Sequence, residues 1–155
     1  MKTAIVTGSY DPITTGHFDL IKRASELFPR VIVAVLDNTE KRFLFNTEKR
    51  FLSVKACFSH NANITVRLWN GLLADLVLQT ENPVIVRGAR NTLDFEYERI
   101  LFEINRELAD AESIILPAKK EYEFISSTFV RELIKYKRPL TGYVPDKAIE
   151  ILNKE

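Results

Sequence analysis

The stretch Gly8-Ser9-Tyr10-Asp11-Pro12-Ile13-Thr14-Thr15-Gly16-His17 separates a short apolar run from an amphipathic segment. The run before it, Ala4-Ile5-Val6, is typical of a buried strand, and the segment after it carries apolar residues at helical spacing: Leu20, Ile21, Ala24, Leu27 and Phe28. We therefore expect a strand, a turn and a helix, with His17 in the first helical turn. Backbone N–H groups and the helix dipole favour an anion there, and Gly16 would let a phosphate approach the backbone. A plain βα loop with His17 as a helix cap explains these residues equally well.

Length and composition indicate one domain, spanning residues 1–155. The chain has 155 residues, of which 46% are hydrophobic, enough for a proper core. Lys and Arg number 22 against 21 Asp and Glu, a net charge of +1, so we expect no binding to nucleic acid or to anionic membranes. The sequence contains neither a membrane-span pattern nor a signal-peptide core, which predicts a cytoplasmic protein. The single Cys57 lies among apolar residues and is expected to be a core thiol.

Strands and helices are expected to alternate along the rest of the chain. Apolar runs of strand length occupy residues 31–36, 64–68, 84–86 and 113–116, and Arg87-Gly88-Ala89-Arg90 is expected to form a loop after the fourth strand. Helical spacing is found over 47–60, 72–77 and 93–108, after residue 128, and from about residue 146. The pattern predicts an α/β fold: a Rossmann-like doubly wound sheet of five parallel strands with helices on both faces.

Three polar segments are predicted to meet at the carboxyl ends of the strands, where doubly wound sheets bind ligands. They are the Gly8–His17 turn, the pair Arg87 and Arg90, and the hydroxyl cluster Ser126-Ser127-Thr128 before the next helix. Two helix N-termini, a histidine and two arginines would suit a polyphosphate, so a nucleoside triphosphate is the expected ligand.

Each of these features also has a simpler interpretation. The two arginines could be ion-pair partners of Asp94 or Glu98, Lys41 could be a solvated loop lysine, and the hydroxyl cluster could be only a helix cap. Other chemistries lack their motifs: the sequence has no G-x-x-x-x-G-K-[ST], no G-x-G-x-x-G, no G-x-S-x-G and no metal-ligand spacing. Phosphoryl or nucleotidyl transfer remains, which depends on positioning and charge neutralisation.

Two motifs resemble signatures of the nucleotidyltransferase superfamily. Thr14-x-Gly16-His17 is similar to its T/H-x-G-H signature, and Ile125-Ser126-Ser127-Thr128-x-x-Arg131 is similar to I-S-S-T-x-x-R. Within the superfamily, residues 11–14, 87–90, 94–98 and 105–106 resemble the bacterial adenylyltransferases that act on 4′-phosphopantetheine. The resemblance extends over essentially the whole chain.

The resemblance implies transfer of AMP from ATP to 4′-phosphopantetheine in coenzyme A biosynthesis, giving dephospho-coenzyme A and pyrophosphate. It also implies Mg²⁺ as the working ion, a homohexamer and feedback binding of coenzyme A. The expected step is an in-line transfer without a covalent intermediate or a general base, because the attacking phosphate is already an anion near neutral pH. Sister enzymes acting on nicotinamide mononucleotide, or on glycerol 3-phosphate with CTP, and a non-catalytic nucleotide-binding module are the alternatives.

By motif position, the resemblance also implies the role of each site residue. The catalytic residues would be His17, Lys41 and Arg90, and the acceptor would meet Ser9, Lys41, Leu73 and Arg87. ATP would be held by Ser9, Tyr10, His17, Gly88, Ala89, Arg90, Glu98, Tyr122, Glu123, Phe124, Ile125, Ser126, Ser127 and Thr128, and no residue is assigned to a metal. The family usually has Thr where this chain has Ser9, and Tyr-Pro or Phe-Pro where it has Val6-Thr7. Serine keeps the hydroxyl group, so we expect the role to survive with altered affinity.

Overall fold

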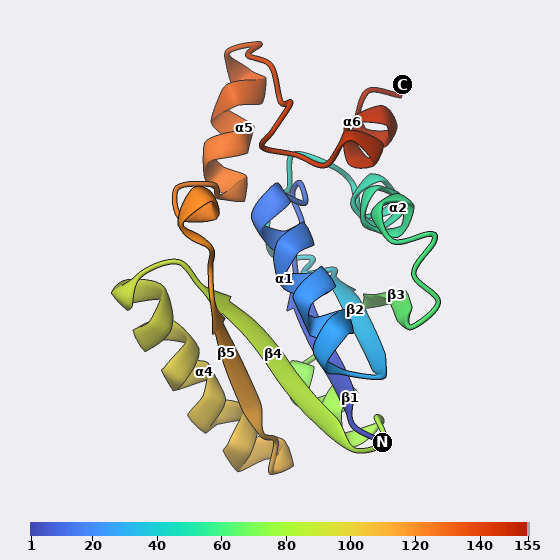
Figure 1. Ribbon diagram of the computed structural model, residues 1–155, viewed down its shortest axis with the longest axis vertical. Helices are drawn as coiled ribbons and strands as arrows, with labels where there is room; N and C mark the ends of the chain where they lie inside the picture. The colour runs from blue at the N-terminus through green and yellow to red at the C-terminus, as the bar shows by residue number, and fades with distance from the viewer. Residues whose placement is uncertain (155) are drawn as a thin grey trace.

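The computed structural model describes residues 1–154, and its centre is one parallel sheet of five strands (Figure 1). The strands are β1 (Thr3–Gly8), β2 (Arg30–Leu36), β3 (Ile64–Trp69), β4 (Pro83–Ala89) and β5 (Ser113–Pro117), in the order β3-β2-β1-β4-β5. The chain leaves β1 toward one edge of the sheet and later returns to its other side, so the direction of winding reverses between β1 and β4. Ligands of doubly wound sheets bind at such a switch point.

The helices are α1 (Thr15–Leu27), α2 (Thr47–Cys57), α3 (Leu73–Leu78), α4 (Thr92–Ala109), α5 (Ser127–Lys135) and α6 (Asp146–Leu152), with a short 3₁₀ helix η1 (Lys120–Tyr122) before α5. Figure 1 shows α1 in front of the sheet and running roughly along β1, α4 running beside β4 and β5, and α5 and α6 gathered at the end where the strands finish. The predicted doubly wound α/β fold is confirmed.

Alternating strand residues face two separate core clusters, one on each face of the sheet. Ala4 and Val6 of β1 belong to the larger cluster, which also takes in Ile21 of α1. Ile5, between them in sequence, belongs to the smaller cluster with Leu76 of α3. Both faces of β1 are therefore buried, which explains why its sequence is apolar throughout rather than alternating.

Two boundaries predicted from the sequence are wrong. Arg87, Gly88 and Ala89 are not in a loop, because β4 continues through them and pairs with the end of β5. The second helix ends at Cys57 rather than at residue 60, and the N–H of Phe58 closes it on the carbonyl of Lys55.

Cys57 packs against the larger core cluster, as expected for a core thiol. Burial raises the pKa of this thiol to about 12, which keeps it protonated at neutral pH. Among residues 1–154, no helix combines the length and the apolar character needed to cross a membrane.

Candidate functional site

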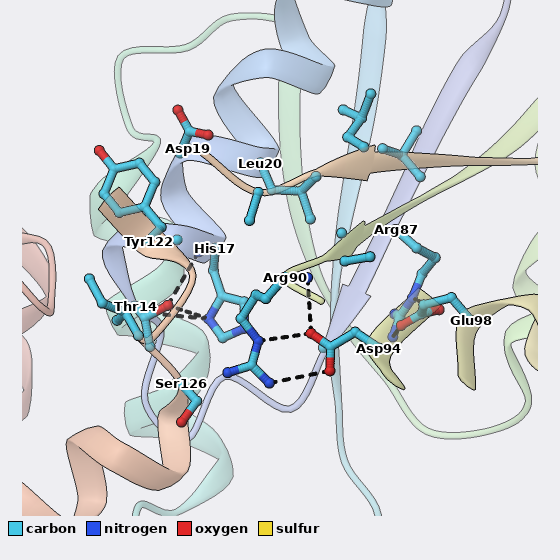
Figure 2. Close-up of a pocket in the computed structure, with 18 of the residues that line it drawn as sticks. Thr14, His17, Asp19, Leu20, Arg87, Arg90, Asp94, Glu98, Tyr122 and Ser126 are labelled. Carbon is cyan, nitrogen blue, oxygen red and sulfur yellow. Dashed lines mark hydrogen bonds and ion pairs between the residues drawn. The ribbon is translucent and has the colours of Figure 1, made fainter. Parts of the chain in front are cut away.

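A cavity of about 340 Å³ opens at the switch point of the sheet (Figure 2). Its walls come from the ends of β1, β4 and β5, the first three turns of α1, the start of α4 and the segment that leads into α5. A cavity of this size is within the range of small-molecule sites. The three polar segments expected to meet at this edge of the sheet do line one cavity.

His17 is both a helix cap and a cavity residue. Thr14 begins α1 as its N-cap: its hydroxyl oxygen accepts from the N–H of His17 at 3.2 Å, and its own N–H donates to His17 Nδ1 at 3.1 Å. An Nδ1 that accepts a hydrogen bond carries no proton, which assigns the ring proton to Nε2. Burial, with the charges of Arg87 and Arg90, lowers the pKa of His17 to about 4. The side chain is therefore a neutral Nε2–H donor at neutral pH.

The ring of Tyr10 packs against the imidazole of His17. Its ring meets that of His17 edge-on, with the centroids 5.2 Å apart, and it is itself buried. Burial raises the pKa of Tyr10 above its ordinary value, so its hydroxyl stays protonated. Gly8 is required here, because a Cβ at this position would lie 3.0 Å from a carbon of the Tyr10 ring.

Arg87 is fixed in place by two partners. Its Nε and Nη2 donate to the carboxylate of Glu98 at 2.8 and 2.9 Å, and its Nη1 donates to the carbonyl and hydroxyl oxygens of Thr7 at 2.9 and 2.7 Å. Burial opposes the charge of Arg87, but the hydrogen bonds and charge of Glu98 outweigh it and raise the pKa of Arg87. The ion pair keeps the Arg87 guanidinium charged and fixed at the cavity wall, beside the carboxylate of Glu98.

Arg90 is held less completely. Its Nε donates to Asp94 Oδ2 at 2.9 Å and its Nη2 to Asp94 Oδ1 at 3.4 Å, whereas Nη1 takes part in neither bond. Burial of Asp94 is outweighed by its hydrogen bonds to Arg90, so the pKa of Asp94 is lowered and the carboxylate stays charged. Figure 2 shows the guanidinium of Arg90 pointing into the same space as the His17 ring. The sequence left two interpretations of Arg87 and Arg90, as ion-pair partners of acidic residues or as residues of a shared cavity. Both arginines form such ion pairs and both line the cavity.

The N-terminus of α5 is tied to the turn after β1. The Ser126 hydroxyl caps the helix by accepting from the N–H of Phe129 at 3.1 Å. Ser127 Oγ donates to the carbonyl of Pro12 at 2.8 Å, and Arg131 Nη1 donates to the carbonyl of Asp11 at 2.8 Å. The second signature motif thus contacts the Asp11-Pro12 turn, from which more than 100 residues separate it in the sequence.

The structure places some of the expected site residues in the cavity and others outside it. The cavity is lined by His17, Arg87, Gly88, Ala89, Arg90, Glu98, Tyr122, Ile125, Ser126 and Ser127. Seven others are not part of its lining: Ser9, Tyr10, Lys41, Leu73, Glu123, Phe124 and Thr128. Of these, Lys41 is exposed on the loop after β2, and Leu73 packs against the smaller core cluster.

Sequence reasoning missed several polar residues of the cavity. Asp19 and Arg23 extend the His17 wall along α1, and Asp19 also pairs with Lys119 at 2.8 Å. Asp19 and Arg23 follow Gly16 at positions i+3 and i+7, which places all three on one helix face. This spacing is a signal from which their place in the cavity could have been predicted. Nothing in the local sequence predicts the contact of Thr7 with Arg87, which spans 80 positions.

Within residues 1–154, no group of three or more His, Cys, Asp or Glu side chains is placed to hold a metal ion. Asp19 and Asp94 do line the cavity, but each carboxylate is engaged by basic side chains. The described residues around the cavity therefore do not offer the carboxylate set of a resident divalent cation.

Residues 5–133 match the family described as cytidylyltransferase-like. A phosphopantetheine adenylyltransferase of Actinobacillus succinogenes is 41% identical over 155 residues, covering 99% of this chain and 96% of the relative. Those of Alkaliphilus metalliredigens and Mannheimia succiniciproducens are 37% and 40% identical, covering 100% and 97% of this chain and 99% and 96% of the relatives. The chain belongs to the cytidylyltransferase-like family and, within it, to the phosphopantetheine adenylyltransferases.

Proposed function

We propose that this chain transfers AMP from ATP to 4′-phosphopantetheine, giving dephospho-coenzyme A and pyrophosphate. Membership of the phosphopantetheine adenylyltransferases supports this reaction. The structural observation that best supports this reaction is the state of His17. It is a neutral Nε2–H donor, held by the cap of α1, at a cavity that the N-termini of two helices approach. Such a donor suits a phosphate, because it stabilises developing charge without needing to change its own protonation state.

The nucleotide phosphates are proposed to occupy the cavity. His17 Nε2 and the Nη1 of Arg90 supply side-chain donors, and the first turns of α1 and α5 supply backbone N–H groups. Gly88, Ala89, Glu98 and the segment from Tyr122 to Thr128 would hold the rest of the nucleotide, although Glu123, Phe124 and Thr128 do not line the cavity itself.

In the proposed step, an oxygen of the acceptor phosphate forms a bond to the α-phosphorus of ATP. The bond from the α-phosphorus to the oxygen that bridges to the β-phosphate breaks, and that oxygen leaves with pyrophosphate. A phosphate monoester has a second pKa of about 6, so the attacking oxygen needs no general base at neutral pH. His17 would donate a hydrogen bond to the charge that develops on the α-phosphate, and Arg90 would neutralise part of the charge on the α-phosphate and the leaving group.

Mg²⁺ is proposed to enter as part of the nucleotide substrate. The carboxylates near the cavity do not form a resident site, and Mg²⁺ in such enzymes is commonly bound largely through substrate phosphates. The ion would neutralise part of the triphosphate charge.

The acceptor is proposed to bind beside the cavity, between the turn after β1 and the loop after β2. Ser9 lies on the first of these segments and Lys41 on the second. Arg87 closes the cavity on its β4 side. Its guanidinium has five N–H groups, of which four donate to Thr7 and Glu98, so one N–H of Nη2 is left to bind the acceptor. Leu73, at the start of α3, would contact the pantetheine arm.

The outer face of α4 supports an oligomer. Its apolar side chains at helical spacing stay exposed in the single chain, with Leu93 82%, Ile100 53% and Leu108 51% accessible. An apolar stripe of this length on one helix is typical of an interface between copies. We propose a cytoplasmic homohexamer, in which coenzyme A acts as a feedback ligand because it contains the pantetheine arm of the acceptor.

Pyrophosphate release with ATP and Mg²⁺ tests the proposal. We expect turnover with 4′-phosphopantetheine, and dephospho-coenzyme A in equal amount by mass spectrometry. Nicotinamide mononucleotide, and glycerol 3-phosphate with CTP, serve as competing acceptors. Faster turnover with either would assign the chain to a sister reaction, and ATP binding without any pyrophosphate release would make it a nucleotide-binding module.

A further inference from the structure

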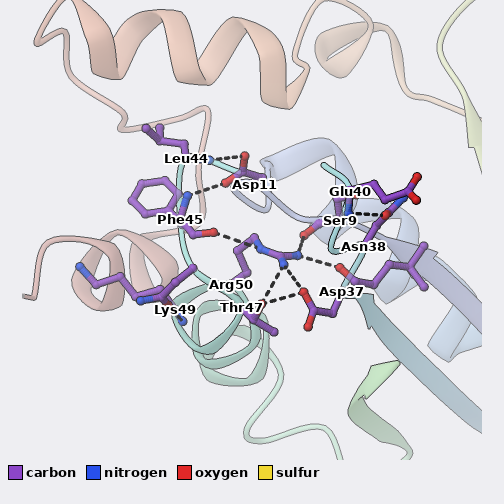
Figure 3. A network of polar contacts seen from close by, with 12 residues as sticks. Ser9, Asp11, Asp37, Asn38, Glu40, Leu44, Phe45, Thr47, Lys49 and Arg50 are labelled. Carbon is purple, nitrogen blue, oxygen red and sulfur yellow. Dashed lines mark hydrogen bonds and ion pairs between the residues drawn. The ribbon is translucent and has the colours of Figure 1, made fainter. Parts of the chain in front are cut away.

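Arg50 of α2 is a buried arginine at the junction of three segments (Figure 3). Its side chain is fully buried, and its Nη1 donates to the carbonyl of Ser9 at 2.7 Å and to that of Leu36 at 2.8 Å. Its Nε donates to the carbonyl of Phe45 at 3.2 Å, and its Nη2 lies 3.5 Å from Asp37. One guanidinium thus joins the turn after β1, the end of β2 and the loop that leads into α2.

Asp11 holds the same loop from the other side. Its two carboxylate oxygens accept from the N–H groups of Leu44 at 2.8 Å and Phe45 at 2.9 Å, and the side chain is buried. Phe45 is therefore fixed at both ends of the residue: Asp11 binds its N–H and Arg50 binds its carbonyl. The ring of Phe43 also lies over the Arg50 guanidinium, 3.8 Å from Cζ.

These contacts lie directly after Lys41 in sequence. The hydrogen bonds of Glu40 and Lys41 stay inside the loop, where both backbone N–H groups donate to Asn38. The position of Lys41 relative to Ser9 is therefore set through residues 43–45 and their two anchors. Burying a charged guanidinium costs desolvation energy that an apolar side chain would avoid, so the gain from Arg50 is the fixed geometry of the carbonyls that it joins.

We propose that Asp11 and Arg50 form a clasp that positions the Lys41 loop against the Ser9 turn, and that both are positioning residues for acceptor binding. The inference rests on the proposed function, which places the acceptor phosphate between Ser9 and Lys41. Neither side chain lines the cavity, and the hydrogen bonds of both converge on Phe45 of the loop.

The substitution Asp11→Asn tests the clasp. An amide offers one oxygen where two N–H groups need acceptors, and it turns an NH₂ toward the other. We expect the KM for 4′-phosphopantetheine to rise about tenfold, the effect of losing one such hydrogen bond, while the KM for ATP changes less than about twofold. Asp146→Asn, at an exposed position on α6, is the matched control and should leave both constants unchanged.

Amide hydrogen exchange supplies a readout that does not depend on catalysis. In Asp11→Asn, residues 43–45 should exchange faster while β1 and β2 keep their protection. The kinetic effect should also be non-additive with Lys41→Ala, because the clasp acts through Lys41. If Asp11→Asn does not fold, Asp37→Asn tests the same network at a half-exposed side chain and should change the two KM values in the same unequal way.

An equal rise in both KM values, unchanged exchange in residues 43–45, or additivity with Lys41→Ala would overturn the clasp. Its failure is distinguishable from failure of the proposed function. An inactive wild type refutes the function and leaves the exchange measurement standing, whereas an active wild type with no unequal change in KM refutes the clasp alone.

Discussion

His17→Ala should lower kcat by about 10²-fold. Removal of one pre-organised donor from a developing charge costs about 3 kcal/mol in the transition state, and each 1.36 kcal/mol is tenfold in rate. The same change leaves the buried N–H of Thr14 without its 3.1 Å acceptor. That loss lowers the free energy of unfolding by about 1 to 3 kcal/mol. In a chain of this size, each kcal/mol lost lowers Tm by about 2–4 °C.

His17→Asn separates the two effects. Its Oδ1 can accept from the N–H of Thr14, but it has no atom at the position of Nε2. We expect a Tm close to that of the wild type with kcat still reduced about 10²-fold. Pyrophosphate release and thermal unfolding measure the two quantities. Near-normal turnover of His17→Asn, or a loss of kcat that follows the loss of Tm across both variants, would refute the catalytic role of Nε2.

Three further predictions concern acid stability, assembly and nucleic acid. The pKa of His17 is lowered from 6.5 to about 4, so its contribution to stability is complete above about pH 6.5 and is lost as the pH falls toward 4. The free energy of unfolding in urea should therefore fall less between pH 7 and pH 4.5 for His17→Asn than for the wild type. Aspartate at both Ile100 and Ile104 should reduce the mass by light scattering to 17.9 kDa, whereas a wild type of that mass would contradict an interface on α4. At a net charge of +1, binding to random DNA at physiological salt should be undetectable at micromolar protein, and sub-micromolar affinity would overturn that expectation.

The first βαβ unit could be predicted from the sequence because its signals are local. An apolar run, a glycine-bearing turn and an amphipathic segment specify β1 and α1, and the spacing of Thr14 and His17 within the first helical turn produces the cap. The boundary at Arg87 could not be predicted in the same way. A charged residue followed by glycine ends an apolar run, whereas pairing with β5 carries the strand three residues beyond Val86, to Ala89.

The parts of the site that were missed depend on contacts between distant segments. Thr7 reads as an ordinary strand residue, and only the fold brings its hydroxyl to Arg87. Arg50 reads as an exposed helical arginine, because arginine is rarely buried without partners, and its carbonyl partners come from three segments that the sheet assembles. Backbone carbonyls leave no trace in the sequence, so a buried cation that binds them cannot be anticipated from residue types.

The proposed division of the site into an acceptor side and a nucleotide side is tested most directly by steady-state kinetics of Lys41→Ala and Arg90→Ala, with each substrate varied in turn. Lys41 lies on the loop after β2 and Arg90 lines the cavity after β4. Lys41→Ala should raise the KM for 4′-phosphopantetheine and change that for ATP much less, whereas Arg90→Ala should raise the KM for ATP and lower kcat through lost charge neutralisation. If both variants change the same KM, or if neither changes either constant, the division into an acceptor side and a nucleotide side is wrong.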